Sequence, residues 1–402
     1  MPMHNGLLPR EGFKADTVVR ILGKTAFNPA FTLPLLLLAR FTKKGENYSI
    51  LHQKAFSRVK LLFYLGLVRW LSSWYSTGVV NNWQDDQYDW RGREVVLITG
   101  GSGGIGGNVV KFLSEKGVKV VVLDIQPLTY EARKSIPFIV VQTHQIRPSV
   151  LTFLAASNVH YFKCDITSPK EIAAVAKDIR SKVGYPTVLI NNAGVARGKS
   201  ILESSEKDIR FTFDVNSLAH YWIVKEFLPS LVENNHGMVV TVASIAAWVT
   251  VPNLVDYAAS KHAALAFHEG LASELATRYR ARKVRTVVVN QGYTRTPLFD
   301  GYSNAAPFLL PTLEPETVAE AIVRQVLSGK SGQVIAPALA NGLSALASMP
   351  HWYQYGLRVD GHKIMKKWHG HQVVTDLEKF YGDKEKNGEV EGSTVLVPQE
   401  SR

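Results

Sequence analysis

Short apolar runs alternate with amphipathic stretches through the middle of the chain, from residue 94 to about residue 337. The runs are rich in β-branched residues and have the length of buried strands. They cover residues 95–98, 118–123, 160–164, 187–190, 238–242, 284–289 and 333–335. Strands that alternate with helices pair in parallel through right-handed crossovers. The pattern therefore predicts an α/β fold with a doubly wound parallel sheet, the Rossmann arrangement.

Two apolar segments precede this region. Residues 31–38 are strongly apolar but contain Pro34, and residues 61–80 are interrupted by Arg69 and several serines. Neither is an unbroken span of about 20 apolar residues, and the opening lacks the layout of a secretory signal. We expect both segments to associate with a membrane interface; the alternative is two helices packed on the folded domain. The polar, acidic residues 81–90 are predicted to form a linker.

These patterns divide the chain into a folded core and its extensions. The predicted parts are residues 1–90, a membrane-associating extension with its linker; 91–337, the catalytic α/β domain; 338–382, an apolar and basic extension; and 383–402, a disordered tail. Residues 137–157 are longer than a crossover needs. They could be an inserted loop, an extra surface helix or sequence from an imperfect gene model, and the sequence favours none of these.

Charge and cysteine content narrow the environment. The formal charge is +12, and basic residues lie among bulky apolar ones near both ends. This mixture suits an anionic membrane surface better than nucleic acid, although a scattered solvated basic surface is the alternative. The single cysteine, Cys164, excludes an internal disulfide and fits a reducing compartment or a cytosol-facing surface. His362, His369 and His371 have no thiolate or strong carboxylate partner nearby, so we predict no metal site.

A glycine-dense turn follows the first predicted strand. It runs Thr99-Gly-Gly-Ser-Gly-Gly-Ile-Gly106, leads into a helix, and is followed by a second strand that ends on Asp124. Glycines let backbone N–H groups approach a pyrophosphate at the positive end of a helix. An acidic residue about 20 positions further on completes the dinucleotide-binding pattern.

A phenol and an ammonium are spaced for joint chemistry further along the chain. Tyr257 and Lys261 stand at i and i+4, on one face of a predicted helix. A neighbouring cation favours the phenolate, so we expect the pKa of Tyr257 to fall and the residue to act as a general acid and base. Ser244, at a strand end, could hold a substrate oxygen, and Asn216 lies on a helical stretch nearby.

Together these motifs resemble the short-chain dehydrogenase/reductase family over residues 94–337. Thr99-Gly100-x-x-x-Gly104-x-Gly106 matches its cofactor motif, and Asn191-Asn192-Ala193-Gly194 its sheet-stabilising motif. Asn216, Ser244, Tyr257 and Lys261 match its catalytic tetrad in order and separation. One departure is Gln291-Gly292, where the family usually has Pro-Gly, so this loop lacks the backbone restraint that a proline would give it.

The resemblance implies a role for each member of the tetrad. Tyr257 would exchange a proton with the substrate oxygen, Lys261 would lower its pKa and bond the nicotinamide ribose, and Ser244 would orient the substrate. Asn216 would hold a water that links Lys261 to solvent. The implied cofactor-binding residues are Thr99, Gly100, Ser102, Gly103, Gly104, Ile105, Gly106, Asp124, Asp165, Ile166, Asn192, Ala193, Gly194, Tyr257, Lys261, Gly292, Thr294 and Thr296.

The cofactor and substrate follow from charge and polarity. Asp124 would accept hydrogen bonds from the adenosine ribose hydroxyls and repel a 2′-phosphate, so we predict NAD(H) over NADP(H). The family resemblance implies that Asp165, after the third strand, meets the adenine. The apolar stretch 297–311 predicts a lipophilic alcohol or carbonyl substrate, such as a retinoid, a steroid or a long-chain aldehyde. The N-terminal extension resembles the membrane-associated retinol dehydrogenase and 17-beta-hydroxysteroid dehydrogenase branch.

That branch implies a cytosol-facing enzyme on the endoplasmic reticulum or on lipid droplets. The family also implies a homodimer formed through the helices over 206–232 and 257–279. A non-catalytic scaffold that binds a nucleotide or a lipid surface is the alternative function, and a soluble enzyme with extra helices is the alternative location.

Overall fold

An eight-stranded parallel sheet forms the centre of the protein in a computed structural model that describes residues 3–4, 8–128, 138–140, 158–304 and 306–386. The strand order is β3-β4-β2-β1-β5-β6-β7-β8. The strands are β1 (Val95–Thr99), β2 (Lys119–Asp124), β3 (Phe138–Val140), β4 (Val159–Lys163), β5 (Val188–Asn191), β6 (Met238–Val242), β7 (Arg285–Gln291) and β8 (Gly332–Ala336). Strands β2 to β4 lie on one side of β1, and strands β5 to β8 lie on its other side. This reversal of the strand order confirms the doubly wound fold.

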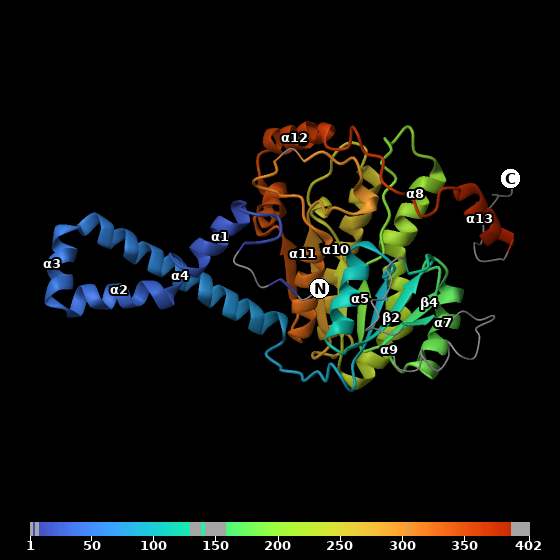
Figure 1. Cartoon of the computed structure of the whole chain (residues 1–402), viewed down its shortest axis with the longest axis horizontal. Helices are drawn as coiled ribbons and strands as arrows, with labels where there is room; N and C mark the ends of the chain where they lie inside the picture. The colour runs from blue at the N-terminus through green and yellow to red at the C-terminus, as the bar shows by residue number, and fades with distance from the viewer. Residues whose placement is uncertain (1–2, 5–7, 129–137, 141–157, 305, 387–402) are drawn as a thin grey trace, which may run out of the picture.

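Helices cover both faces of the sheet (Figure 1). Alternate strand residues enter two separate cores, so the central strands are buried on both sides, as their continuous apolar sequences predict. One core includes α7 (Pro169–Lys182), α9 (Ala219–Asn234) and α10 (Val255–Thr277). The other includes α5 (Gly104–Glu115) and α11 (Pro315–Leu327).

The sheet gains one edge strand that sequence reasoning did not assign. β3 lies within the segment 137–157 and pairs in parallel with β4. Its residues, Phe-Ile-Val, have high strand propensity, and edge pairing explains why they form a strand rather than the loop or helix considered above. The rest of that segment lies outside the described residues.

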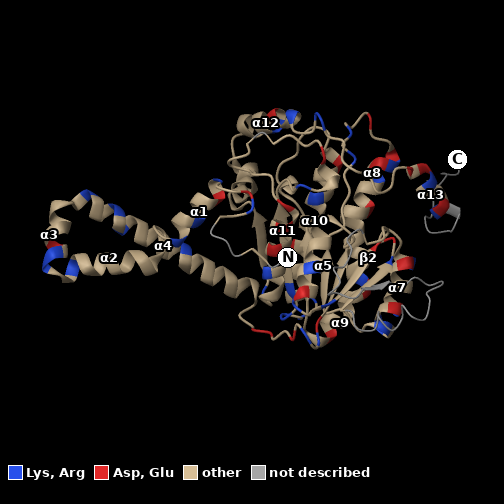
Figure 2. Cartoon of the chain, in the orientation of Figure 1, with Lys and Arg blue, Asp and Glu red and all other residues tan. Residues whose placement is uncertain are grey.

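Four helices before the sheet form an arm that projects from the domain (Figure 1). They are α1 (Ala15–Lys24), α2 (Pro29–Phe41), α3 (Lys43–Leu51) and α4 (Gln53–Val80), with α2 packed along α4. Apolar residues dominate α2 and α4, whereas lysines gather near the far end at α3 (Figure 2). Among the described residues no single helix is long and apolar enough to cross a bilayer. The pair α1 and α2 reaches the required length and composition, with a bend of 47°.

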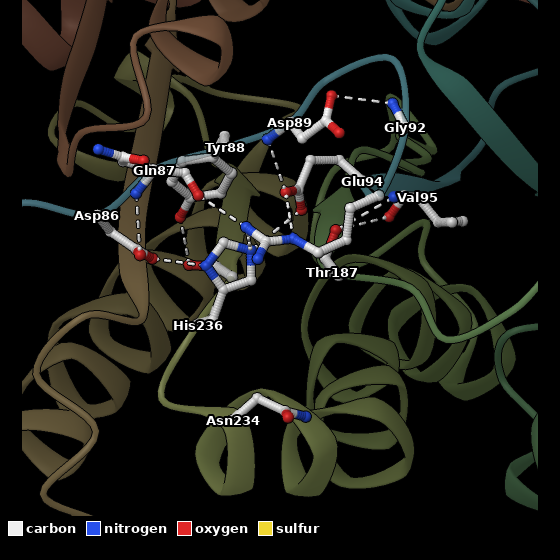
Figure 3. Close-up of polar contacts among 12 residues, drawn as sticks. Asp86, Gln87, Tyr88, Asp89, Gly92, Glu94, Val95, Thr187, Asn234 and His236 are labelled. Atoms are coloured by element: carbon white, nitrogen blue, oxygen red, sulfur yellow. Dashed lines mark hydrogen bonds and ion pairs between the residues drawn. The ribbon is translucent and has the colours of Figure 1, made fainter.

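The linker after α4 is fixed beneath the sheet. The fully buried Arg285 guanidinium donates hydrogen bonds to the carbonyl oxygens of Asn81 and Gln84. Close by, the His236 imidazole bridges two carboxylates, with 2.6 Å to Asp86 and 3.1 Å to Glu94 (Figure 3). These contacts set how the arm leaves the domain.

The other end of the arm contacts the C-terminal extension and the stretch 297–311. The Asp16 carboxylate of α1 accepts hydrogen bonds from the backbone N–H groups of Ala338 (2.7 Å) and Leu339 (3.0 Å). The backbone N–H of Ala15 donates to the carbonyl oxygen of Phe308 at 3.1 Å. The chain segment that forms the arm is therefore attached to the domain at its start, in α1, and at its end, after α4, while α3 lies at the far end of the arm.

The C-terminal extension contains a 3₁₀ stretch (Ala338–Ser348), α12 (His351–Asp360) and α13 (Leu377–Lys386). The predicted boundary of a disordered tail at residue 383 is wrong, because α13 continues to Lys386. Tyr381 and Lys384 are buried on this helix, which packs on α8 (Glu206–Phe213). Residues 387–402, the remainder of the predicted tail, lie outside the described residues.

Candidate active site

The glycine turn joins β1 to the start of α5 and allows close approach of backbone segments. A Cβ on Gly106 would lie 2.2 Å from the carbonyl oxygen of Gly100, a distance that no side chain tolerates. Gly100 and Gly104 have φ values of +66° and +56°, which favour glycine. The first N–H groups of α5, which have no partners within the helix, are the groups that hold phosphates at other helix N-termini.

Asp124 lies at the end of β2 beside this turn. Its Oδ2 accepts a hydrogen bond from the backbone N–H of Ser102 at 2.9 Å, and its Oδ1 accepts one from that of Gln126 at 3.0 Å. The carboxylate is thus held at the rim of the cavity that the glycines line. A fixed negative charge at this position suits ribose hydroxyls and disfavours a phosphate.

Asn192 connects the turn to the end of β5. Its side-chain amide donates to the carbonyl oxygens of Thr99 and Gly100, each at 3.0 Å. The Thr99 hydroxyl accepts from the backbone N–H groups of Asn192 and Ala193, each at 3.1 Å. Thr99 is buried behind the turn, so it stabilises the site instead of lining it.

Tyr257 and Lys261 lie on the first two turns of α10, buried among the carboxyl ends of the strands. Burial raises the pKa of the Tyr257 phenol to about 12, and a hydrogen bond with Ser244 opposes this increase. Burial also lowers the pKa of Lys261 to about 8.

The expected fall in the Tyr257 pKa is therefore wrong for this arrangement. The Lys261 Nζ donates to the carbonyl oxygen of Val242 at 2.9 Å, and it lies 5.8 Å from the centroid of the tyrosine ring. Burial disfavours charge on both residues, and at Tyr257 the desolvation of the phenol outweighs the opposing hydrogen bond with Ser244.

Asn216 lies behind the cavity on a π-helical turn, Asp214–Leu218, between α8 and α9. Its Oδ1 accepts from the backbone N–H of Val195 at 2.8 Å, and its Nδ2 donates to the carbonyl oxygen of Val195 at 2.9 Å and to the Ser260 hydroxyl at 3.0 Å. The amide therefore fixes the loop after β5. Its predicted role in holding a water stays a prediction.

One cavity of about 940 Å³ brings these residues together. The sequence-predicted residues that line it are Gly100, Ser102, Gly103, Gly104, Ile105, Gly106, Asp124, Asp165, Ile166, Asn192, Ala193, Gly194, Ser244, Tyr257, Lys261, Gly292, Thr294 and Thr296. The cavity continues from the glycine turn, past Tyr257, to an apolar end. Its lining therefore combines the glycine turn of the dinucleotide-binding pattern with an apolar end.

The apolar end is formed partly by residues from the stretch 297–311. Leu298, Phe299, Tyr302 and Leu310 line the cavity, and the Phe299 ring meets Tyr257 edge-on with 5.6 Å between centroids. Phe308 and Leu309 instead point to solvent, so not all of the apolar residues in this stretch contribute.

The C-terminal extension supplies lining residues that sequence reasoning missed. They are Leu343, Leu357, Asp360, Gly361, Ile364, His371, Gln372, Val373 and Phe380. The Gln372 amide donates to the carbonyl oxygen of Ala196 at 2.7 Å, and the Trp368 indole donates to that of Leu298 at 3.0 Å. The apolar and aromatic composition of this extension was the only available signal, and it also fitted a membrane surface.

Gln291 is buried at the cavity wall where β7 ends. Its carbonyl oxygen accepts a hydrogen bond from the Ser244 hydroxyl at 3.3 Å, and Gly292 continues the chain with its N–H donating to Ala336. The loop therefore keeps Gly292 and Thr294 at the cavity without a proline at this position.

These residues fit a nicotinamide dinucleotide. The glycine turn leaves no room for side chains where phosphates would approach the α5 N-terminus. Asp124 lies beside this turn, where its carboxylate would face the ribose hydroxyls. The residues Asp165 and Ile166, which follow β4, and Asn192-Ala193-Gly194, which follow β5, line the same cavity.

Comparisons with known proteins agree with this geometry. Residues 94–306 match the short chain dehydrogenase family model. The chain is 43% identical to Dehydrogenase RED2 of Cochliobolus heterostrophus over 54% of this chain and 75% of that protein. It is 34% identical to mouse Epidermal retinol dehydrogenase 2, covering 58% of this chain and 71% of the relative. It is 35% identical to mouse Estradiol 17-beta-dehydrogenase 11, covering 59% and 73%.

A solved structure supports the fold. It is a short chain dehydrogenase from Burkholderia cenocepacia in complex with NADP, with a TM-score of 0.50 and 25% identity, covering 65% of this chain and 96% of that one. The region that matches the family model, residues 94–306, contains the glycine turn and the tetrad. This chain belongs to the short-chain dehydrogenase/reductase family of NAD(P)-dependent oxidoreductases, and within it is similar to the retinol and estradiol 17-beta dehydrogenases.

Proposed function

We propose that the protein interconverts an alcohol and a carbonyl group on a lipophilic substrate, with NAD(H) as the preferred cofactor. The observation that carries this proposal is one continuous cavity whose lining includes the glycine turn, Ser244 and Tyr257, and an apolar end whose Phe299 ring contacts Tyr257. The nicotinamide cofactor supplies hydride transfer, and the protein supplies position and proton exchange. A retinoid, a steroid and a long-chain aldehyde all fit this chemistry.

Each polar group at the middle of the cavity has a separate task in the proposal. Ser244 orients the substrate oxygen, and Tyr257 exchanges a proton with that oxygen. The Ser244 hydrogen bond lowers the cost of the phenolate, because it opposes the effect of burial on the tyrosine pKa. Lys261 moves the proton on from Tyr257, since its lowered pKa of about 8 lets it gain or lose a proton near neutral pH.

Turnover with a substrate panel tests this proposal. Full-length protein in detergent is assayed with retinoids, sterols and long-chain aldehydes in both directions, following NADH absorbance. Tyr257→Phe should abolish turnover while leaving NADH affinity nearly unchanged. Tyr279→Phe is the matched control, because this exposed hydroxyl contacts only Glu274 among the described residues. Undiminished turnover in Tyr257→Phe contradicts the assigned role, and a wild type that binds NADH without any turnover favours a scaffold.

We also propose that the arm binds a cytosol-facing membrane surface. Leu35, Leu38, Trp70 and Trp74 are all more than half exposed on α2 and α4, and exposed apolar side chains that lie together mark surfaces for membranes or partners. Lys43 and Lys44 begin α3, the helix at the far end of the arm (Figure 2), where they can reach lipid phosphates. Since α1 contacts the 297–311 stretch, a membrane-bound arm holds the apolar end of the cavity near the lipid.

Vesicle flotation of the full chain tests the membrane proposal. The double variant Leu35→Glu and Leu38→Glu should reduce binding to phosphatidylcholine vesicles that contain phosphatidylserine. The control is Ile201→Glu with Leu202→Glu, which changes two exposed apolar residues of the catalytic domain. Equal flotation of the wild type and the arm variant contradicts membrane binding by α2.

A further inference from the structure

The C-terminal helix α13 lies beside the part of the cavity expected to take adenosine. Phe380 lines the cavity together with Asp165 and Ile166, the residues after β4, and its ring meets Phe211 edge-on with 5.3 Å between centroids. Although α13 begins 41 residues after β8 ends, it packs on α8 at the opposite side of the domain from the arm (Figure 1).

An ion pair attaches α13 to the cavity wall. The Lys384 ammonium lies 2.8 Å from Oδ2 of Asp165 and also donates to the Thr167 hydroxyl. Oδ1 of Asp165 accepts hydrogen bonds from the backbone N–H of Thr167 (2.9 Å) and from its hydroxyl (2.8 Å). Both oxygens of the Asp165 carboxylate are therefore held in place, and the position of Oδ2 depends on the ion pair with Lys384.

The rest of α13 is anchored in the core, so the helix can serve as a wall. Leu377 and Tyr381 are buried in the core beneath the sheet face that carries α9 and α10. The Tyr381 hydroxyl donates to Oδ2 of Asp214 at 2.6 Å, at the first residue of the π-helical turn that carries Asn216. The Lys384 ammonium lies 4.6 Å from the centroid of the Phe380 ring. This cation–π contact keeps the ring next to the ion pair.

We propose that α13 completes the adenosine subsite of the dinucleotide cavity, with Phe380 as its apolar outer wall and Lys384 as the residue that positions Asp165. This inference rests on the proposed nicotinamide-cofactor function and adds cofactor-binding residues outside the region that the family model matches. An adenine is a flat, mostly apolar group with polar edges. Such a group is held by apolar walls and a small number of oriented polar groups.

The test measures cofactor affinity without turnover. NADH and ADP-ribose, which carries the adenosine end but no nicotinamide, are titrated into the full-length protein by calorimetry. Lys384→Met keeps the apolar stem but removes the charge, and Phe380→Ala removes the wall. Lys379→Met is the matched control, because Lys379 is an exposed lysine on the same helix.

For Lys384→Met and Phe380→Ala we expect the Kd for both ligands to rise by about three- to tenfold, the range for losing one partly buried contact. The rise should be equal for NADH and ADP-ribose, and Lys379→Met should bind like the wild type. Wild-type affinity in both variants overturns the inference, as does a lower melting temperature with unchanged Kd. If the wild type binds neither NADH nor NADPH, the proposed function itself fails, so the two failures are distinguishable.

Discussion

Oδ2 of Asp124 lies 2.9 Å from the backbone nitrogen of Ser102, so the acidic residue at the end of β2 is tied to the glycine turn. The carboxylate cannot move aside to admit a 2′-phosphate without breaking this hydrogen bond and the one from Gln126. Under the proposed preference for NAD(H), cofactor choice and the shape of the turn are coupled through one side chain.

Changing Asp124 should change cofactor preference. In Asp124→Ala we expect the ratio of kcat/KM for NAD(H) over NADP(H) to fall by about tenfold, which corresponds to roughly 1.4 kcal/mol. Overall affinity should also fall, because the Ser102 N–H loses its acceptor. Steady-state kinetics with both cofactors measures the ratio, and Asp178→Ala, on the exposed side of α7, is the control. An NADPH preference in the wild type would overturn the assignment.

Ser244 should set the pH at which alcohol oxidation begins. Its hydrogen bond lowers a tyrosine pKa that burial raises, and oxidation needs the phenolate as base. Ser244→Ala should therefore shift the rising limb of kcat/KM for oxidation to higher pH and reduce the rate by about 10²-fold or more. The exposed Ser181→Ala should leave the profile unchanged. A lower rate with an unshifted limb would leave Ser244 only an orienting role.

His236 should stabilise the protein in mildly acidic solution. Asp86 and Glu94 raise its pKa above 6.5, although the Arg93 guanidinium also approaches the ring. The contribution of His236 to stability is complete below pH 6.5 and is lost as pH rises through its raised pKa. The pKa of Glu94 is lowered from 4.5, so the contribution of Glu94 to stability is lost as pH falls below 4.5. The deficit of His236→Gln in urea unfolding should therefore be largest between these two values, at about 1 kcal/mol. A deficit that grows above pH 7 would contradict the ion pair.

His220 should act in the opposite direction. It is completely buried on α9, and burial lowers its pKa to about 3. An unfolded chain takes up the proton that the folded chain excludes, so this residue costs stability as pH falls below 6.5. We expect His220→Phe to gain about 2 kcal/mol relative to the wild type between pH 7 and pH 5. Denaturant unfolding at both pH values measures this, with the exposed His351→Phe as control; parallel curves would disprove it.

Sequence reasoning predicted most of the fold because its signals are local. Apolar runs of strand length, the glycine turn and the spacing of Tyr257 and Lys261 each depend on neighbouring residues, and the structure places all three as expected. The edge strand β3 was missed because three apolar residues carry no distinct period. The end of α13 was missed because Tyr381 and Lys384 are stabilised by Asp214 and Asp165, far away in the sequence.

The sequence by itself determined the α/β class, the strand–turn–helix unit at the glycine turn, and the spacing of Tyr257 and Lys261, since each follows from short-range pattern or spacing. Only the tertiary structure decided three further properties. It raised the Tyr257 pKa instead of lowering it, because burial of the phenol outweighs the opposing hydrogen bond with Ser244. It brought residues 343–380 to the cavity, and it fixed the arm through Arg285 and Asp16. Burial and contacts between distant segments depend on the packed chain, and no local pattern encodes them.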